Sequence, residues 1–213
     1  RPGRTVGGQA SLQLGNFDNA RFALSFDLPL GDKLATRFAA YKLMRDGYTD
    51  NLATGNQVDG RDQWAVRSTT VFEAGENTDF TLIFGMYDED STRAREGKRM
   101  CKAHPVLGCD PRQLGFDSPD ANTTILNTLA RFFTPFPAGT NIYAGAPNPT
   151  DLRKVAADTD PTYKLDQRFV TFDGNHRFGD LKLSGVVAWS EGSTEQNTDW
   201  DNADLPFRFT RPI

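Results

Sequence analysis

The connections between the expected strands most constrain the fold of this chain, because they alternate between very short and very long. The short joins are 29–33, 75–79 and 178–180, and the long ones run over about 46–62, about 91–167 and from 191 to near the end. A soluble sheet has no reason to sort its loops by length. A sheet that crosses a bilayer has tight turns at one end and long loops at the other. The pattern predicts an antiparallel up-and-down transmembrane β-barrel, or part of one.

Seven segments show the two-residue period of a strand with one apolar face. In the second segment, for example, Phe22, Leu24 and Phe26 alternate with more polar neighbours. A tilted strand needs about 9–11 residues to cross a bilayer, and the segments have about that length. The expected strands are 8–14, 21–28, about 34–45, about 63–73, 80–87, about 168–178 and 181–189, with the start of an eighth at 206–211.

The composition fits a barrel better than a compact soluble core. Hydrophobic residues make up 38% of the chain and the mean hydropathy is −0.55. No apolar run is long enough for a membrane-spanning helix, whereas a membrane strand shows only every second residue to lipid. The 16 phenylalanines suit the aromatic girdles of a barrel. Acidic and basic residues are well mixed and the net charge is −4, which predicts no nucleic-acid partner.

A soluble antiparallel sheet with one buried face would also produce the alternating pattern. It would not explain the sorted connections or the long insertion at about 91–167, which is unusual in a compact domain. Inside that insertion, apolar residues at helical spacing predict a short helix over 123–133, and a second short helix is expected over 151–157.

The two cysteines, Cys101 and Cys109, both lie in the long insertion. In an oxidising compartment they are expected to form a disulfide, worth roughly 2–3 kcal/mol by loop-closure entropy. Free thiols are one alternative. A metal site that also uses His104 is another, although two cysteines and one histidine fall short of the usual four zinc ligands.

No catalytic signature is present, so the sequence predicts a protein that is not an enzyme and needs no cofactor. The histidines His104 and His176 are isolated in sequence. The acidic clusters at 88–90, 158–160 and 199–204 lack the glycine and final glutamate of an EF-hand loop. They are interpreted as solvated loop tips, and no metal site is predicted.

Short motifs follow one another along the chain in a specific order. They are Arg1-Pro2, Gly7-Gly8, Gly15-Asn16-Phe17-Asp18, Leu28-Pro29-Leu30-Gly31-Asp32, Arg45-Asp46-Gly47-Tyr48-Thr49-Asp50-Asn51 and Asp59-Gly60-Arg61-Asp62-Gln63. In this order they resemble the start of the barrel in TonB-dependent outer-membrane receptors. The segment from Cys101 to Cys109 is similar to a cysteine-bearing outer loop in one subset of them. The resemblance spans essentially the whole chain, and its specificity comes from the order of motifs that mostly mark turns.

The resemblance implies that residues 1–213 are the N-terminal portion of a barrel of roughly 22 strands, with the plug domain and the rest of the barrel absent. The parent would lie in the outer membrane of a Gram-negative bacterium. It would import a scarce nutrient, such as a ferric siderophore, cobalamin or an oligosaccharide, into the periplasm. The implied partners are the plug domain, the inner-membrane TonB complex, outer-membrane lipid and lipopolysaccharide, and the small nutrient ligand. The alternatives are a passive porin or adhesin barrel, and a soluble β-sandwich binding module.

Polar residues that alternate with the apolar ones are expected to face the lumen of the barrel. They are the candidates for ligand contact, although hydrogen bonding with the plug or within the wet lumen would also account for them. The candidates are Gln13, Arg21, Asp27, Arg37, Gln63, Arg67 and Lys182.

Overall fold

The computed structural model describes residues 1–93, 100, 102–104, 108–110, 112–116, 147, 149–199 and 210–212. Within these ranges the regular structure is all β, and no helix in them is long and apolar enough to cross a membrane. The strands are β1 (Gly7–Gly15), β2 (Asn19–Pro29), β3 (Leu34–Arg45), β4 (Thr49–Asn51), β5 (Gln57–Val58), β6 (Arg61–Gly75), β7 (Thr78–Ser91), β8 (Lys102–His104), β9 (Gly108–Asp110), β10 (Lys154–Val155), β11 (Thr162–Phe178), β12 (Leu181–Asp199) and β13 (Thr210–Pro212).

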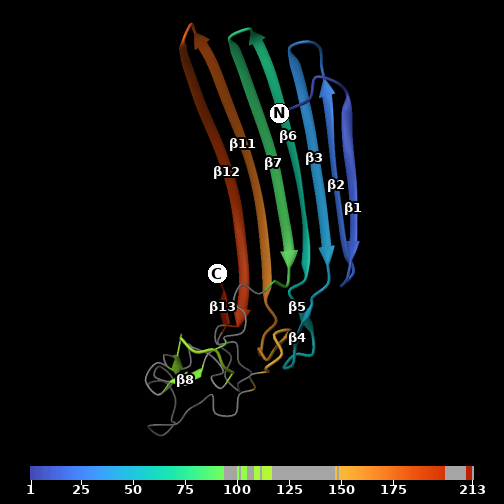
Figure 1. The fold of residues 1–213 in the computed structure, drawn as a ribbon, viewed down its shortest axis with the longest axis vertical. Coiled ribbons are helices and arrows are strands. Elements are labelled where there is room, and N and C mark those ends of the chain that lie inside the picture. Colours follow the sequence, from blue (N-terminus) through green and yellow to red (C-terminus); the bar gives the residue numbers. More distant parts are fainter. Residues whose placement is uncertain are drawn as a thin grey trace. The chain divides into compact units, whose positions relative to one another are not determined.

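The main sheet has eight strands in the order β1-β2-β3-β6-β7-β11-β12-β13 (Figure 1). Adjacent strands from β1 to β7 pair antiparallel, as do β12 and β13. This confirms the expected all-β, up-and-down antiparallel architecture. Two smaller sheets have the orders β10-β4-β5 and β8-β9.

The chain divides into two compact units. The first, which we call the strand unit, comprises Arg1–Arg45, Arg61–Ser91 and Lys164–Thr194. The second, which we call the loop unit, comprises Asp46–Gly60, Thr92–Tyr163 and Glu195–Ile213. Most of the main sheet belongs to the strand unit, and the small sheet β10-β4-β5 belongs to the loop unit.

Tight turns join β2 to β3, β6 to β7 and β11 to β12, as the sequence predicts. Two of them need a left-handed backbone, which glycine supplies at Gly31 (φ 103°) and Gly179 (φ 56°). The connection from β1 to β2 breaks the predicted alternation, because it is also short although it lies at the opposite end of the sheet. Its tight geometry depends on positive φ at Phe17 (61°) and Asp18 (48°), which non-glycine residues adopt only occasionally.

Several strands are longer than predicted. β11 begins at Thr162 and β12 continues to Asp199, six and ten residues beyond their expected limits. In the β12 extension both faces of the strand carry polar residues, so the alternation of polarity on which the prediction depended is absent. In the β11 extension Tyr163 and Leu165 do alternate with polar residues, but the prediction placed this segment in the long insertion. The eighth strand, β13, pairs antiparallel with the end of β12, and residues 206–209 of the predicted strand lie outside the described residues.

The prediction of a short helix over 151–157 is wrong. The Asp151 side chain accepts a hydrogen bond from the Arg153 amide at 2.9 Å, which fixes a turn. The chain then forms β10, which pairs parallel with β4. The amide groups of Asp50 and Leu52 donate to the carbonyls of Arg153 and Val155, each at 2.8 Å. Pairing with β4 therefore takes the backbone groups that a helix would need.

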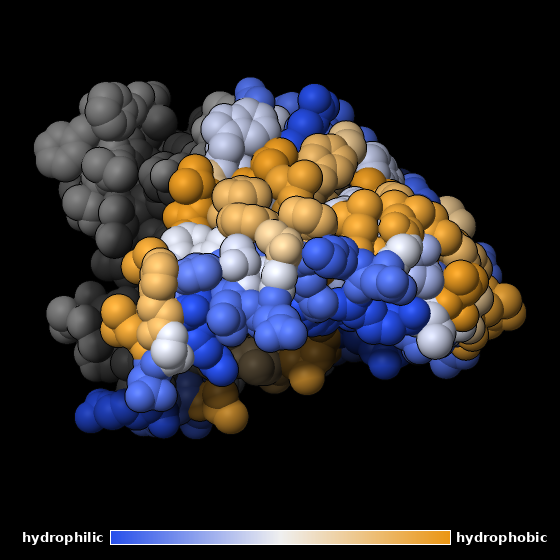
Figure 2. Space-filling view, turned by 90° about the horizontal axis from the view of Figure 1, so that it is seen from above, coloured by the Kyte–Doolittle hydropathy of each residue, from blue (hydrophilic) through white to orange (hydrophobic). Residues whose placement is uncertain are grey.

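The strand unit has two chemically distinct faces. Direct register pairs place the same parity of residues on one side of β1 to β7, because neighbouring side chains along a strand point to opposite sides. The apolar face carries the even-numbered residues of these strands, including Leu24, Phe26, Phe38 and Phe84, all of which are exposed. Viewed onto the end with the short turns, hydrophobic residues gather in bands beside the hydrophilic turns (Figure 2).

Candidate functional site

The other face of the strand unit, the polar face, carries the residues that the sequence predicts to contact ligand. Gln13 lies opposite Arg21, Arg21 opposite Leu43, and Leu43 opposite Gln63, so these residues form one row across four strands. Residues an even number of positions away on the same strands share their face. The polar face therefore also includes Asp27, Arg37 and Arg67.

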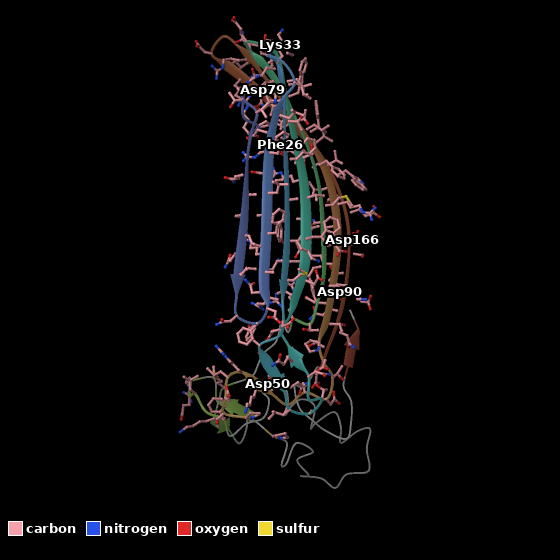
Figure 3. The ribbon with its side chains drawn as sticks, turned by 90° about the vertical axis from the view of Figure 1, so that its right-hand side faces the viewer. Phe26, Lys33, Asp50, Asp79, Asp90 and Asp166 are labelled. Atoms are coloured by element: carbon pink, nitrogen blue, oxygen red, sulfur yellow. The ribbon has the colours of Figure 1, made fainter. Side chains whose placement is uncertain are left out.

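Lys182 lies on the same face, as hydrogen bonds between neighbouring residues at the short-turn end indicate. Asn175 on β11 donates from Nδ2 to Asp79 on β7 at 3.4 Å and accepts from the Ser184 hydroxyl on β12 at 2.8 Å. Asp79 lies opposite Glu73 in the register of the polar face. Lys182 is two residues from Ser184 and shares its side of β12. Figure 3 labels Lys33 and Asp79 at this end and Asp90 and Asp166 at the opposite end.

Two of the seven candidates form a pair. Arg37 Nε lies 3.7 Å from Asp27 Oδ1, and an Arg37 terminal nitrogen donates to the Ser25 hydroxyl at 3.2 Å. The structure therefore brings Asp27 and Arg37 together as a cross-strand pair, which supports the sheet itself.

Gln63 belongs to a second polar cluster, near the end with the long connections. The Tyr87 hydroxyl lies 3.0 Å from Gln63 Oε1 and 2.7 Å from Glu89 Oε2, and the Ser91 hydroxyl donates to Glu89 Oε1 at 2.8 Å. Glu89 is only 2% exposed. The prediction of a solvated loop tip at 88–90 is therefore wrong for Glu89, because hydrogen bonds from its own strand hold the carboxylate inside.

Residues 1–6, which we call the strap, lie against the polar face at the short-turn end. Arg1 pairs with Glu73 Oε1 at 3.0 Å, and Arg4 pairs with Glu73 Oε2. Arg4 also donates to the backbone carbonyl of Asp32, in the turn between β2 and β3. Pro2 between them is buried. Sequence reasoning missed Glu73 in this role, because its partners lie about seventy positions away in the chain.

The middle of the polar face contains a hollow of about 530 Å³ between β1, β2, β3 and β6. Its polar-face residues are mostly small: Ser11, Ala23, Ser25, Ala39 and Ala65. Larger polar side chains also line it, from Gln9, Tyr41 and Arg67. Of the predicted candidates, only Arg67 lines this hollow.

The loop unit has its own polar cluster around Asn51, which is 1% exposed. Asn51 Nδ2 donates to the Ala157 carbonyl at 2.8 Å and to Asp160 Oδ1 at 2.9 Å. Its Oδ1 accepts from the amides of Ala53 and Ala157 at 3.2 and 3.1 Å. Both N–H groups and both oxygen lone pairs of this buried amide are thereby engaged, so Asn51 joins the β4–β5 hairpin to the segment after β10.

Asp160 receives further hydrogen bonds from the same hairpin. Thr54 donates to Oδ1 at 2.7 Å and Asn56 donates to Oδ2 at 2.6 Å. Burial by itself would raise the pKa of Asp160, but the hydrogen bonds from Asn56, Thr54 and Asn51 outweigh it and hold the pKa below its ordinary value. The carboxylate therefore stays ionised and fixes the hairpin, and no sequence motif marks this pairing.

The remaining sequence predictions are placed as follows. The pairing of Cys101 with Cys109 and the helix over 123–133 lie outside the described residues. His176 accepts or donates a hydrogen bond with Thr78 at 2.7 Å and stacks edge-on against Phe178. Within the described ranges, no group of three histidine, cysteine, aspartate or glutamate side chains is placed to hold a metal ion.

Comparison with known proteins gives one structural likeness. The fold is similar to the crystal structure of the ferric yersiniabactin uptake receptor FyuA from Yersinia pestis, with a TM-score of 0.59 and 14% sequence identity. The match covers 92% of this chain and 24% of the receptor, so the chain spans about a quarter of that protein's length. No protein-family model and no curated protein matches the sequence. The likeness establishes the fold, an antiparallel sheet like a portion of that uptake receptor.

Proposed function

We propose that this chain is part of the β-barrel domain of a TonB-dependent outer-membrane receptor, which binds a scarce nutrient and imports it into the periplasm. In this arrangement the apolar face contacts lipid and the polar face lines the barrel interior. The short turns between β2 and β3, β6 and β7, and β11 and β12 face the periplasm, and the long connections project from the cell. The plug domain, the TonB complex and outer-membrane lipid are the proposed partners.

The observation that carries the proposal is the exposed apolar face of a sheet whose opposite face is polar. Leu183 and Val187 on β12 are 62% and 73% exposed. Contiguous exposed apolar surface marks an interface or a membrane contact. The strands β1 to β3, β6, β7, β11 and β12 contain 9–19 residues, enough for tilted strands to cross a bilayer.

Polar groups on the apolar face also suit contact with lipid. The hydroxyls of Thr36 and Thr70 lie opposite each other and share a hydrogen bond at 3.0 Å. A hydrocarbon solvent offers no other partner, so such groups must satisfy each other. Nearer the long connections, Lys42 and Asp62 form an ion pair on the same face, where the apolar residues give way to charged ones.

The proposal is tested with the full-length protein encoded by the gene that contains this sequence. Uptake of three radiolabelled probes (a panel of ferric siderophores, cobalamin and maltooligosaccharides) is measured in strains with and without the gene and with and without TonB. We expect uptake of at least one probe to need both. Uptake that needs the gene but not TonB would favour a passive porin. Recovery of the folded protein in the soluble fraction would favour a binding module.

A further inference from the structure

The polar face of the strand unit has an excess of unpaired positive charge. Within the part of the chain that the structure describes, each carboxylate on this face has a hydrogen-bond or ion-pair partner: Asp27, Glu73, Asp79, Glu89 and Asp173. Four basic side chains on the same face have none in that part: Arg21, Arg67, Arg177 and Lys182. The face therefore offers donors to an anion and holds no spare carboxylate for a cation.

One of these cations, Arg67, borders the hollow of about 530 Å³. That volume lies within the range of about 300–1,000 Å³ that is typical of small-molecule sites. Arg67 lies opposite Ala39 on β3 and opposite Gly85 on β7. Because neither neighbour has a side chain beyond Cβ, the guanidinium is open to the hollow on one side.

The other side of Arg67 is bounded by an aromatic ring. A Cβ built on Gly85 would lie 2.4 Å from ring atoms of Phe169, so the ring covers this glycine next to Arg67. Tyr41 and Gln9 add a hydroxyl and an amide at the border of the hollow. A guanidinium with neutral donors beside it, above a floor of alanine and serine, is suited to a planar or branched anion.

We propose that the hollow is a binding site for an anionic small ligand, with Arg67 as its charged contact and Tyr41 as a hydrogen-bonding contact. The proposal rests on the proposed receptor function and narrows its ligand class to anions. The charge complementarity of the face decides between anionic and neutral ligands. An anion would form a charge-assisted hydrogen bond with the exposed Arg67 guanidinium, whereas an uncharged ligand would gain less from this contact.

The test uses the full-length protein and two iron-55 complexes of similar size, an anionic ferric tris-catecholate and an uncharged ferric trihydroxamate. We expect the anionic complex to bind at least tenfold more tightly, with an affinity that falls as salt rises. Arg67→Gln is expected to weaken its binding about tenfold, the loss of one charged hydrogen bond, and Arg67→Lys to weaken it less. Arg21→Gln removes a cation outside the hollow and is expected to change the affinity far less.

A second pair of variants tests the location of the binding site by adding a larger side chain inside or outside the hollow. Ala39 lines the hollow, whereas Ala20 lies on the apolar face of β2 and does not line it. Ala39→Leu is expected to reduce binding at least tenfold, while Ala20→Leu leaves it unchanged and controls for the added side chain. Assembly into the outer membrane is checked for every variant.

Equal affinity for the two complexes would overturn the proposal, as would unchanged binding in both Arg67→Gln and Ala39→Leu. Failure of both complexes to bind would also overturn the proposal, as would occupation of the hollow by another part of the full-length polypeptide. TonB-dependent uptake of cobalamin or of an oligosaccharide alone would leave the receptor function intact and reject only the anion site.

Discussion

The ring of Phe169 on β11 occupies the space in which residue 85 on β7 would carry its Cβ. A Cβ at Gly85 would lie 2.4 Å from Phe169 Cε1 and Cζ, a separation at which one of the two must move. Glycine at this position therefore allows an aromatic side chain to approach the backbone of the neighbouring strand closely.

Gly85→Ala is expected to destabilise the full-length protein by about 1–3 kcal/mol, the usual cost of overpacking. The free energy of unfolding is measured by urea titration in lipid vesicles. Gly185→Ala on β12 is the matched control, because no atom lies within 4 Å of its Cβ position. In a Phe169→Ala background the cost of Gly85→Ala should largely vanish, and an undiminished cost there would contradict the explanation.

Two neighbouring valines on β12 distinguish the side of the strand that we propose to face lipid from the side that we propose to face the barrel interior. Val187→Arg is expected to destabilise the folded protein by about 2–4 kcal/mol if the site lies near the bilayer midplane. Val186→Arg, on the other side of the strand and similarly exposed, is expected to have little effect. The measurement is the yield of folded protein in outer membranes. Equal yields for the two variants would argue against the proposed membrane orientation.

Asn51→Ala should loosen the β4–β5 hairpin, because it removes four hydrogen bonds and leaves buried groups unsatisfied. We expect a local loss of about 2–4 kcal/mol. Hydrogen exchange of the amides at 49–58 reports this loss directly. Gln57→Ala serves as the control, since its side chain makes one exposed hydrogen bond to Asp50 at 3.3 Å. Protection that survives Asn51→Ala would show that other contacts hold the hairpin.

The same hairpin should respond to acid through Asp160. The pKa of Asp160 is lower in the folded protein than in the unfolded chain, so its contribution to stability is fully present above the unfolded value. That contribution is lost as the pH falls below about 4 and through the folded pKa. After correction for intrinsic exchange rates, protection at 51–56 should therefore be constant above this range and fall below it. Asp160→Asn should remove this dependence, and a persistent acid transition in that variant would assign it to another group.

The strap should become accessible to protease when Glu73 loses its charge. Arg1 and Arg4 each pair with one oxygen of this carboxylate, and these side chains are partly exposed. Exposed pairs contribute up to about 1 kcal/mol, which corresponds to roughly a fivefold change in opening. We expect Glu73→Gln to raise tryptic cleavage after Arg4 by about that factor, with Glu76→Gln in the adjacent turn as the control. Identical cleavage rates in the two variants would mean that the ion pairs do not hold the strap.

The sequence predicted the strands well where one face is apolar. The alternation of Phe22, Leu24 and Phe26 identified β2, and the polar residues between them identified the polar face. The same signal failed where both faces are polar, so the end of β12 was missed. Residues 151–157 had a plausible helical pattern, but pairing of β10 with β4 depends on a contact between segments about a hundred positions apart.

The polar clusters were beyond prediction for the same reason. Asn51 and Asp160 are 109 residues apart and belong to no recognisable motif. Glu73 lies 72 residues from Arg1. Alternation can assign a residue to a face, but it cannot say which residues of that face pair with each other. The seven predicted candidates therefore share a face, while only Arg67 among them borders the hollow.

The fixed parity of β1 to β7 also limits how the gene can change. Insertion or deletion of one codon inside β6 would exchange the two faces for the rest of that strand. If the change precedes Val66, it would turn Arg67 toward the apolar face and Val66 toward the polar face. Length variation should therefore accumulate in the connections or occur within strands in steps of two codons. The register of this sheet therefore constrains the coding sequence as well as the fold, because only even-numbered changes in strand length keep each side chain on its own face.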